Sequence, residues 1–138
     1  MECSQEILSF IVKTAITFNG GNSYHIALII FQLFPDIYKT SIVNGKVLWY
    51  KKEDDAWISL KKIDFEINTF RNEIGKYLDY ARHSLKMPDD KDPDYENRYK
   101  IFLENMTKIL KLQEKIYNRG IMKDVIHELA ELYYDKTI

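Results

Sequence analysis

The chain has 138 residues, of which 46% are hydrophobic and 30% are charged, and its formal net charge is -1 at pH 7. This length predicts one domain, and the hydrophobic content is high enough to build a buried core. A nearly neutral chain does not attract nucleic acid through its overall charge, so any such contact would depend on a local basic patch.

The composition also argues against secreted and membrane proteins. The single cysteine, Cys3, cannot form an internal disulfide, which is typical of a reducing compartment. There is no run of about 18 apolar residues, so we expect no membrane span and no membrane partner. The first residues, MECSQE, do not resemble a signal peptide. We therefore expect a cytoplasmic or nuclear protein.

Sequence signatures of catalysis are absent as well. The chain contains no phosphate-loop pattern GxxxxGK[ST], no dinucleotide pattern GxGxxG, no HExxH and no CxxC. His25, His83 and His127 are far apart and share no metal-ligand spacing. The sequence therefore predicts a chain that is not itself an enzyme and that has no catalytic residues, no cofactor and no metal.

Two helices are predicted at the amino-terminal end. Apolar residues spaced by three and four indicate an amphipathic helix over 4–17, and Gly20 and Gly21 end it because glycine readily adopts positive φ. A second helix is expected over 23–34, with Ser23 as its N-cap. It is apolar on nearly every side, which is typical of a central buried helix.

A small β-meander follows, with strands expected over about 39–43, 46–52 and 56–60. Asn44-Gly45 is the strongest hairpin signal, because a type I′ turn needs positive φ at both of its central residues. A second turn is expected at Asp54. The two turns together fix which residues lie opposite each other.

This register assigns the side chains to two faces of the sheet. Val43 should lie opposite Lys46, and Lys52 opposite Trp57. One face then carries apolar side chains that we expect to pack on the helices: Ile42, Val47, Trp49, Ile58 and Leu60. The other face mixes lysine with aromatic and serine side chains: Lys39, Ser41, Tyr50, Lys52, Trp57 and Ser59.

The second face has two interpretations. Lysines can hold a phosphate backbone while aromatic rings stack on bases, so this region is a candidate site for single-stranded or forked DNA. The candidate DNA-binding residues are Lys39, Tyr50, Lys51, Lys52, Trp57, Lys61 and Lys62. Alternatively, Trp57 and Tyr50 pack under a neighbouring helix, with lysine stems over the rings. Residues 36–62 hold six lysines against four acidic residues, so we expect any DNA binding to be weak.

The rest of the chain is predicted to be helical, over about 63–86, 93–118 and 121–134. Within the first of these helices Gly75 would mark a close contact, and Gly120 separates the last two. An aromatic stripe on the middle helix has core spacing: Tyr95, Tyr99, Phe102 and Met106. The aspartate-rich stretch before that helix lacks the glycine and glutamate of a calcium loop, so we expect a solvated loop.

These elements predict an α+β, predominantly helical fold. We expect a helical bundle with a small wing-like, three-stranded antiparallel β-meander, forming a single domain over 1–138. Gly20-Gly21 before a helix could hold a phosphate, but no strand precedes it and a helix break is the better interpretation.

The order of the features resembles one family. Gly21-Asn22-Ser23 begins the buried helix, the hairpin reads LWYKKEDDAWISL, and the last helix reads GIMKDVIHELAELYYDK. Over residues 20–138 this arrangement resembles the segment preceding the helicase domain in poxvirus-type primase–helicases of large nucleocytoplasmic DNA viruses. In that family an aromatic pair ends one strand and a tryptophan returns one hairpin later, as Trp49-Tyr50 and Trp57 do here.

The resemblance implies an accessory domain without catalytic residues. Family members carry an archaeo-eukaryotic-type primase domain upstream and a superfamily 3 ATPase downstream, so ATP and Mg²⁺ would bind in the parent protein outside this segment. The middle region forms part of a collar beside the hexameric motor. There it would contact DNA, bind the neighbouring helicase and primase domains, or support a homo-oligomer inside the host cell. A protein–protein interaction module unrelated to DNA replication is the alternative.

Overall fold

A computed structural model describes residues 3–135 of the chain. Over these residues the protein is 62% helical, with five α-helices and one three-stranded antiparallel sheet, so the predicted α+β, predominantly helical fold is confirmed. The elements in chain order are α1 (Gln5–Thr17), α2 (Ser23–Leu33), β1 (Tyr38–Val43), β2 (Lys46–Glu53), β3 (Ala56–Leu60), the 3-10 turn η1 (Ile63–Glu66), α3 (Ile67–Ser84), α4 (Tyr95–Ile116) and α5 (Arg119–Leu132).

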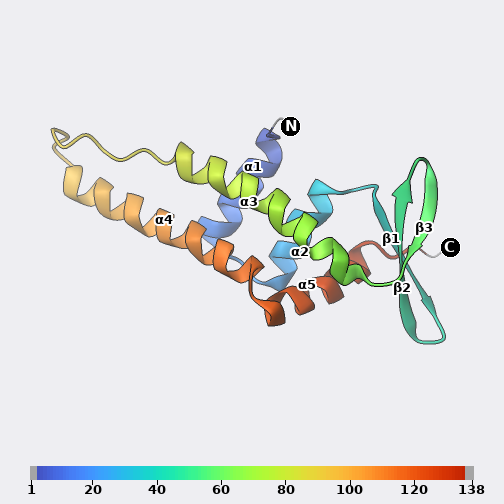
Figure 1. Ribbon diagram of the computed structural model, residues 1–138. Helices are drawn as coiled ribbons and strands as arrows, with labels where there is room; N and C mark the ends of the chain where they lie inside the picture. Colours follow the sequence, from blue (N-terminus) through green and yellow to red (C-terminus); the bar gives the residue numbers. More distant parts are fainter. Residues whose placement is uncertain (1–2, 136–138) are drawn as a thin grey trace.

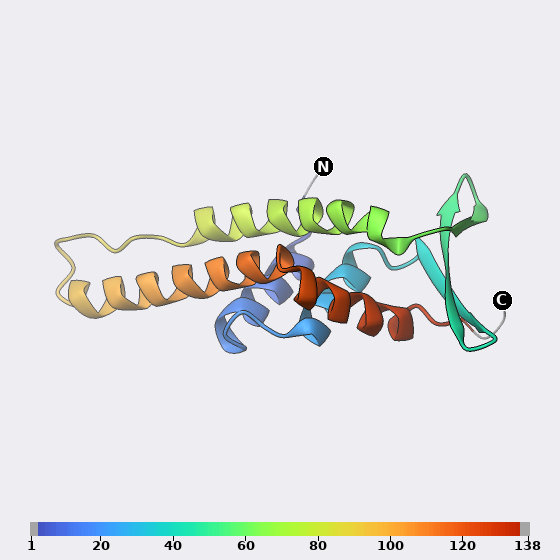
Figure 2. The same ribbon diagram turned by 60° about the horizontal axis from the view of Figure 1, so that its bottom comes forward.

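The helices form an elongated bundle with the sheet at one end. Figures 1 and 2 show α3 and α4 running side by side, with the loop between them at the end farthest from the sheet. In the middle of the bundle, α2 packs on α5 and α1 packs on α4. No helix within residues 3–135 is long and apolar enough to cross a membrane.

The core is built around α2, as its apolar composition predicts. Ile26, Ala27, Ile29 and Ile30 are fully buried. Around them pack apolar side chains from the other helices: Ile11, Ala15, Phe70, Ile74, Leu78, Ala81, Ile109, Leu112, Ile116, Met122, Val125 and Leu129. A cluster of aromatic rings joins this helical core to the sheet: Phe31, Phe34, Tyr38, Trp49, Phe70 and Tyr133.

The turn between α1 and α2 follows from local backbone chemistry. Asn19, Gly20 and Gly21 adopt φ of 52°, 88° and 75°, and these positive values reverse the chain. The predicted N-cap at Ser23 is wrong, because Asn22 caps α2 instead. Its side-chain oxygen accepts the His25 N–H at 3.0 Å, while His25 Nδ1 accepts the Asn22 N–H at 3.1 Å. This reciprocal pair satisfies two backbone donors at the helix start.

The predicted register of the sheet is confirmed. Val43 pairs with Lys46 across the first turn, where Asn44 and Gly45 have φ of 52° and 78°. Lys52 pairs with Trp57 across the second turn. In that turn Asp54 and Asp55 both have positive φ, which aspartate tolerates better than most residues because its short side chain bonds locally.

The expectation that the whole apolar face packs on the helices is correct only near the bundle. Trp49 is buried and Leu60 packs against the core. Ile42, Val47 and Ile58, however, are 58%, 47% and 44% exposed. The reason is that the strands extend beyond the end of the bundle, so no helix covers the outer part of this face (Figure 1).

The carboxy-terminal segment supports the edge of β1. The Thr40 N–H donates to the Tyr133 carbonyl at 3.0 Å, and the Asp135 N–H donates to the Thr40 carbonyl at 3.1 Å. The Thr40 hydroxyl also donates to the Ala130 carbonyl at 2.7 Å. These bonds fix the sheet to the end of α5 and occupy part of an otherwise open strand edge.

Several helix boundaries differ from the predicted ones. Residues 63–66 form the 3-10 turn η1, and α3 begins only at Ile67. Gly75 marks no close contact, since a Cβ there would meet nothing within 4 Å. Gly120 does not separate the last two helices. It lies inside the first turn of α5, and Asn118 caps that helix by accepting the Ile121 N–H at 2.9 Å.

The aromatic stripe at the start of α4 is not part of the fully buried core. Tyr95, Tyr99, Phe102 and Met106 are only partly buried, and the first three rings stack along the helix at centroid distances of 5.6 and 6.3 Å. This half of α4 extends beyond α1 and α2 (Figure 2), so only α3 and the loop after it accompany it. Full burial begins at Ile109.

Candidate functional sites

The first candidate site is the basic and aromatic face of the sheet, which we call the sheet surface: Lys39, Tyr50, Lys52 and Trp57. The register places all four side chains on one face. Trp57 is 37% exposed and lies opposite Lys52, which is exposed. Tyr50 is partly buried, and its hydroxyl accepts the Ser41 hydroxyl at 3.4 Å.

Lys39 occupies one side of the Trp57 ring. Its Nζ lies 4.3 Å from the ring centroid and 3.2 Å from an Asp135 carboxylate oxygen. A cavity of about 520 Å³ opens here between the sheet and the carboxy-terminal segment. Trp57 therefore lies beside that segment, and a lysine lies over its ring. The Lys39 ammonium is already partnered, so Lys52 is the less constrained cation of the sheet surface.

Lys51 lies on the opposite face of the sheet from the other candidate residues. Its Nζ is 2.7 Å from Glu66 Oε1, and the Tyr38 hydroxyl donates to the same oxygen at 3.1 Å. Burial, followed by the nearby Glu66 carboxylate, raises the pKa of Tyr38 well above its ordinary range. Lys51 thus connects β2 to η1 and does not contribute to the sheet surface.

Lys61 and Lys62 are exposed in the link between β3 and η1. They extend the positive charge from the sheet toward the helical bundle. Together with Lys52 they form the exposed cations of the region that the sequence identified as a candidate DNA-binding site.

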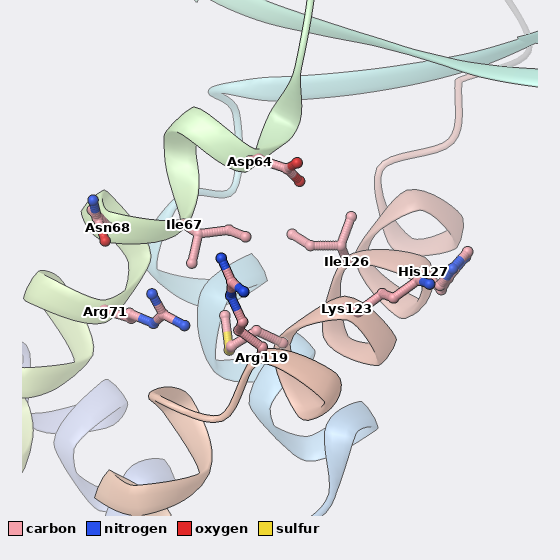
Figure 3. A pocket seen from close by; sticks show the side chains of 9 residues that line it. Asp64, Ile67, Asn68, Arg71, Arg119, Lys123, Ile126 and His127 are labelled. Carbon is pink, nitrogen blue, oxygen red and sulfur yellow. The ribbon is translucent and has the colours of Figure 1, made fainter.

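A second candidate site, the basic cleft, lies between α3 and the amino-terminal half of α5. Its volume is about 560 Å³. Figure 3 shows its lining residues, which come from η1, α3 and α5: Asp64, Ile67, Asn68, Arg71, Arg119, Met122, Lys123, Ile126 and His127. Three of these side chains are cationic and one is acidic.

Arg71 is held in a fixed orientation at the cleft. Its Nε–H donates to the Ile116 carbonyl at 2.5 Å, and its guanidinium lies 5.5 Å from the centroid of the Tyr117 ring. The first contact uses Nε and the second uses the face of the guanidinium, so neither uses the edge that carries the two terminal nitrogens. The terminal nitrogens of Arg71 are directed toward the space that Arg119 also enters (Figure 3).

Arg119 and Lys123 reach the cleft from successive turns of α5. Both are exposed, and within residues 3–135 neither makes a salt bridge or side-chain hydrogen bond. Asp64 lies toward the sheet end of the cleft and likewise forms no ion pair with the cleft cations in this part of the chain (Figure 3). The cleft therefore gathers three cationic side chains, none of which forms a salt bridge within residues 3–135.

No local sequence pattern predicts the basic cleft. Arg71 and Arg119 are far apart in the chain, and only the packing of α3 against α4, together with the turn from α4 into α5, brings them to one cavity. A partial signal exists in α5, since Arg119 and Lys123 are four residues apart and the first turn of this helix contains no acidic residue. Cations are unusual at the positive end of a helix dipole.

No protein-family model matches the chain, and no curated protein matches it. Among the described residues, no three His, Cys, Asp or Glu side chains are grouped so that they could hold a metal ion.

Proposed function

We propose that the chain is a non-catalytic accessory domain of a viral DNA replication primase–helicase, and that its sheet surface contacts single-stranded DNA. The observation that carries the proposal is Trp57, an exposed ring at 37% accessibility, directly opposite the exposed Lys52. The resemblance in the hairpin sequence supplies the biological setting, the cytoplasm or nucleus of a host cell.

The chemistry of the sheet surface suits a single strand. An aromatic ring that stacks on a base contributes about 1–3 kcal/mol, and it does so for any base sequence. Lys52, Lys61 and Lys62 would neutralise phosphates, so affinity would fall as the salt concentration rises. The net charge of -1 limits the affinity of one copy. In a ring of several subunits, repeated copies of the surface would raise the effective affinity.

The test compares DNA binding by matched variants. A labelled single-stranded or forked oligonucleotide is titrated with the wild type, Trp57→Ala, Lys52→Glu and the control Lys100→Glu. Lys100 is an exposed lysine on α4, in the half of the helix that extends away from the sheet (Figure 2). We expect Trp57→Ala to weaken binding by about fivefold or more, which corresponds to about 1 kcal/mol or more. Lys52→Glu should weaken binding and reduce the salt dependence, whereas Lys100→Glu should change neither.

Two results would overturn the proposed contact. One is wild-type binding that Trp57→Ala and Lys52→Glu leave unchanged in affinity and salt slope. The other is an absence of wild-type binding even at low salt. Lys51→Glu is unsuitable as a probe, because it would place two carboxylates together at Glu66.

The ATPase and primase activities would belong to the parent protein. ATP and Mg²⁺ would bind outside this segment, and the isolated chain should hydrolyse no ATP. A clean preparation that turns over ATP, and loses this activity when one residue of this chain is changed, would contradict the proposal. The coding sequence downstream gives an independent test, because the resemblance requires a GxxxxGK[ST] phosphate loop there.

An exposed apolar hairpin favours a second candidate function, a protein–protein interaction module. At the end of the β1–β2 hairpin, four apolar side chains are between 38% and 58% exposed, with Ile42 and Val47 on one face and Val43 and Leu48 on the other. Exposed apolar side chains gathered at one end of a molecule are typical of a surface that a partner protein covers. Sizing the chain alone, and mixed with the adjoining helicase domain, would test this function. Association that Val47→Lys abolishes supports it, and a monomer under both conditions contradicts it.

A further inference from the structure

We propose that the basic cleft between α3 and α5 binds a phosphate monoester. The cleft is separate from the sheet surface, uses different residues and would recognise a different chemical group. The inference therefore does not depend on whether the sheet surface binds DNA.

Arg71 supplies the preorganised part of the site. Its Nε–H is already bonded to the Ile116 carbonyl, and the Tyr117 ring lies beside its guanidinium. These contacts leave the terminal nitrogens directed into the cleft (Figure 3). A planar guanidinium held in this way can bond two phosphate oxygens at once, with little further loss of side-chain entropy.

Arg119 and Lys123 supply the remaining positive charge. Arg119 is the first residue of α5, at the positive end of its dipole, where a cation is unfavourable without a nearby anion. Figure 3 shows its side chain entering the same space as that of Arg71. Two guanidinium groups repel each other unless an anion lies between them. A local arrangement that opposes the usual electrostatic preference is characteristic of a binding site.

The remaining lining residues shape a pocket for more than an inorganic ion. Ile67, Met122 and Ile126 form an apolar wall, beside which the carbon atoms of a phosphate ester could pack. The volume of about 560 Å³ lies within the range of about 300–1,000 Å³ that is usual for small-molecule sites. It exceeds the space that one phosphate group needs, so the group that carries the phosphate also has room.

The charge balance favours a monoester over a diester. The cleft brings three cationic side chains and one acidic side chain, Asp64, to the same cavity. A phosphate monoester carries a charge of about −1.5 to −2 at neutral pH, whereas each diester linkage of a nucleic acid carries one negative charge. A monoester can come from a free nucleotide or from the 5′ end of a nucleic acid strand.

The experiment uses three probes and two matched arginine variants. Inorganic phosphate, adenosine monophosphate, and one oligonucleotide with and without a 5′-phosphate are titrated by calorimetry into the wild type, Arg119→Gln and Arg98→Gln. Arg98 is an exposed arginine in the first turn of α4, where it pairs with Asp92 and Asp94, and it does not line the cleft, so it serves as the control. The Arg119 side chain is exposed and makes no hydrogen bond or salt bridge within the described residues. The unfolding midpoint of Arg119→Gln should therefore match that of the wild type.

We expect saturable binding of inorganic phosphate or adenosine monophosphate to the wild type, weakened at least tenfold by Arg119→Gln and unchanged by Arg98→Gln. Arg119→Lys should bind with intermediate affinity, because it keeps the charge but loses the bidentate geometry. Tighter binding of adenosine monophosphate than of inorganic phosphate identifies a nucleotide as the source. Tighter binding of the 5′-phosphorylated oligonucleotide than of its 5′-hydroxyl form identifies a strand end.

The proposal is overturned if no phosphate probe binds saturably, or if Arg119→Gln binds as the wild type does. Failure here is distinguishable from failure at the sheet surface. Trp57→Ala should leave phosphate binding unchanged, and Arg119→Gln should leave binding of the 5′-hydroxyl oligonucleotide unchanged. Loss of both kinds of binding in either variant would show that the two sites are one, and would contradict the separate cleft.

Discussion

The ammonium of Lys51 lies 2.7 Å from Oε1 of Glu66, and this ion pair joins the central strand of the sheet to the turn that precedes α3. Glu66 is a buried acid, only 9% exposed. Its carboxylate is satisfied by Lys51 and by the Tyr38 hydroxyl, so the polar contacts at this junction depend on one another.

Removing the ammonium should destabilise the protein. We expect Lys51→Ala to lower the free energy of unfolding by about 1–3 kcal/mol, because it leaves a buried carboxylate with one partner fewer. The neighbouring Lys52 is exposed on the opposite face, so Lys52→Ala should change stability by less than about 0.5 kcal/mol. Urea unfolding of both variants gives the comparison. Equal effects of the two substitutions would contradict a structural role for the ion pair.

The two tryptophans provide a test of the face assignment. Trp49 is buried between the Tyr38 and Tyr133 rings, and Trp49→Ala should cost about 3–5 kcal/mol in denaturant unfolding. Trp57 is partly exposed, so Trp57→Ala should cost clearly less. A loss below about 1 kcal/mol for Trp49→Ala would be inconsistent with its burial.

Alkaline pH should destabilise the protein through two buried tyrosines. Burial raises the pKa of Tyr38 and of Tyr133 above the ordinary value of 10.0, so both hydroxyls stay protonated in the folded state. The unfolded chain loses these protons at about pH 10. The stability that the two groups contribute is therefore fully present below about pH 10 and is lost as the pH rises further. Above about pH 10, each of the two tyrosines should lower the free energy of unfolding by about 1.4 kcal/mol per pH unit.

Unfolding measured by denaturant between pH 8 and pH 11 checks this slope. Tyr38→Phe and Tyr133→Phe should each make the decline above about pH 10 less steep. Tyr24 is 47% exposed, so Tyr24→Phe serves as the control for removing a tyrosine hydroxyl outside the core. A loss of stability that begins well below pH 10, or one that neither Tyr38→Phe nor Tyr133→Phe alters, would show that these two tyrosines are not its cause.

Two glycines have similar φ values but different surroundings, so comparing them separates the energetic cost of steric contact from the cost of backbone strain. Gly21 has φ of +75°, and a Cβ there would lie 2.7 Å from Thr14 Cγ2. Gly45 has φ of +78°, and a Cβ there would meet nothing within 4 Å. We expect Gly45→Ala to cost about 1 kcal/mol, through the positive φ alone. Gly21→Ala should cost about 1–3 kcal/mol more, because backbone or side-chain atoms must also shift.

Thermal unfolding of the two glycine variants measures this difference. The double variant Gly21→Ala/Thr14→Ser, which removes the methyl group in the way, should recover part of the loss. Equal costs for Gly21→Ala and Gly45→Ala would show that the tight contact with Thr14 is unimportant.

Local sequence chemistry predicted those parts of the fold that depend on neighbouring residues. The Asn44-Gly45 turn set the pairing of β1 and β2, and that pairing correctly placed Trp49 and Trp57 on opposite faces. The DNA-binding candidates include Lys51, which lies between Tyr50 and Lys52 in sequence. Alternation along a strand, however, puts it on the other face, and its partner Glu66 lies in a different element.

What the sequence could not predict is how far each element extends past its neighbours. Val47 and Met106 stand at apolar positions with core spacing, yet neither is fully buried, because the hairpin and the first half of α4 project beyond the helices that could cover them. Periodicity reports which face of an element is apolar and not what packs on it. The sequence does not reveal the basic cleft for the same reason, since Arg71 and Arg119 line one cavity only through the packing of α3 on α4 and the turn from α4 into α5.

The bonds between Thr40 and the end of α5 have a consequence for the order of folding. The Tyr133 ring completes the aromatic cluster, and its carbonyl holds the edge of β1, although the two segments are separated by most of the chain. During synthesis the hairpin can form early, but its docking on the bundle is complete only after Tyr133 has left the ribosome, because Tyr133 contacts both Thr40 and the rings of Tyr38 and Trp49. Contacts of such long sequence separation form late and slowly. We therefore expect the sheet to dock last and its amide hydrogens to exchange sooner than those of α2.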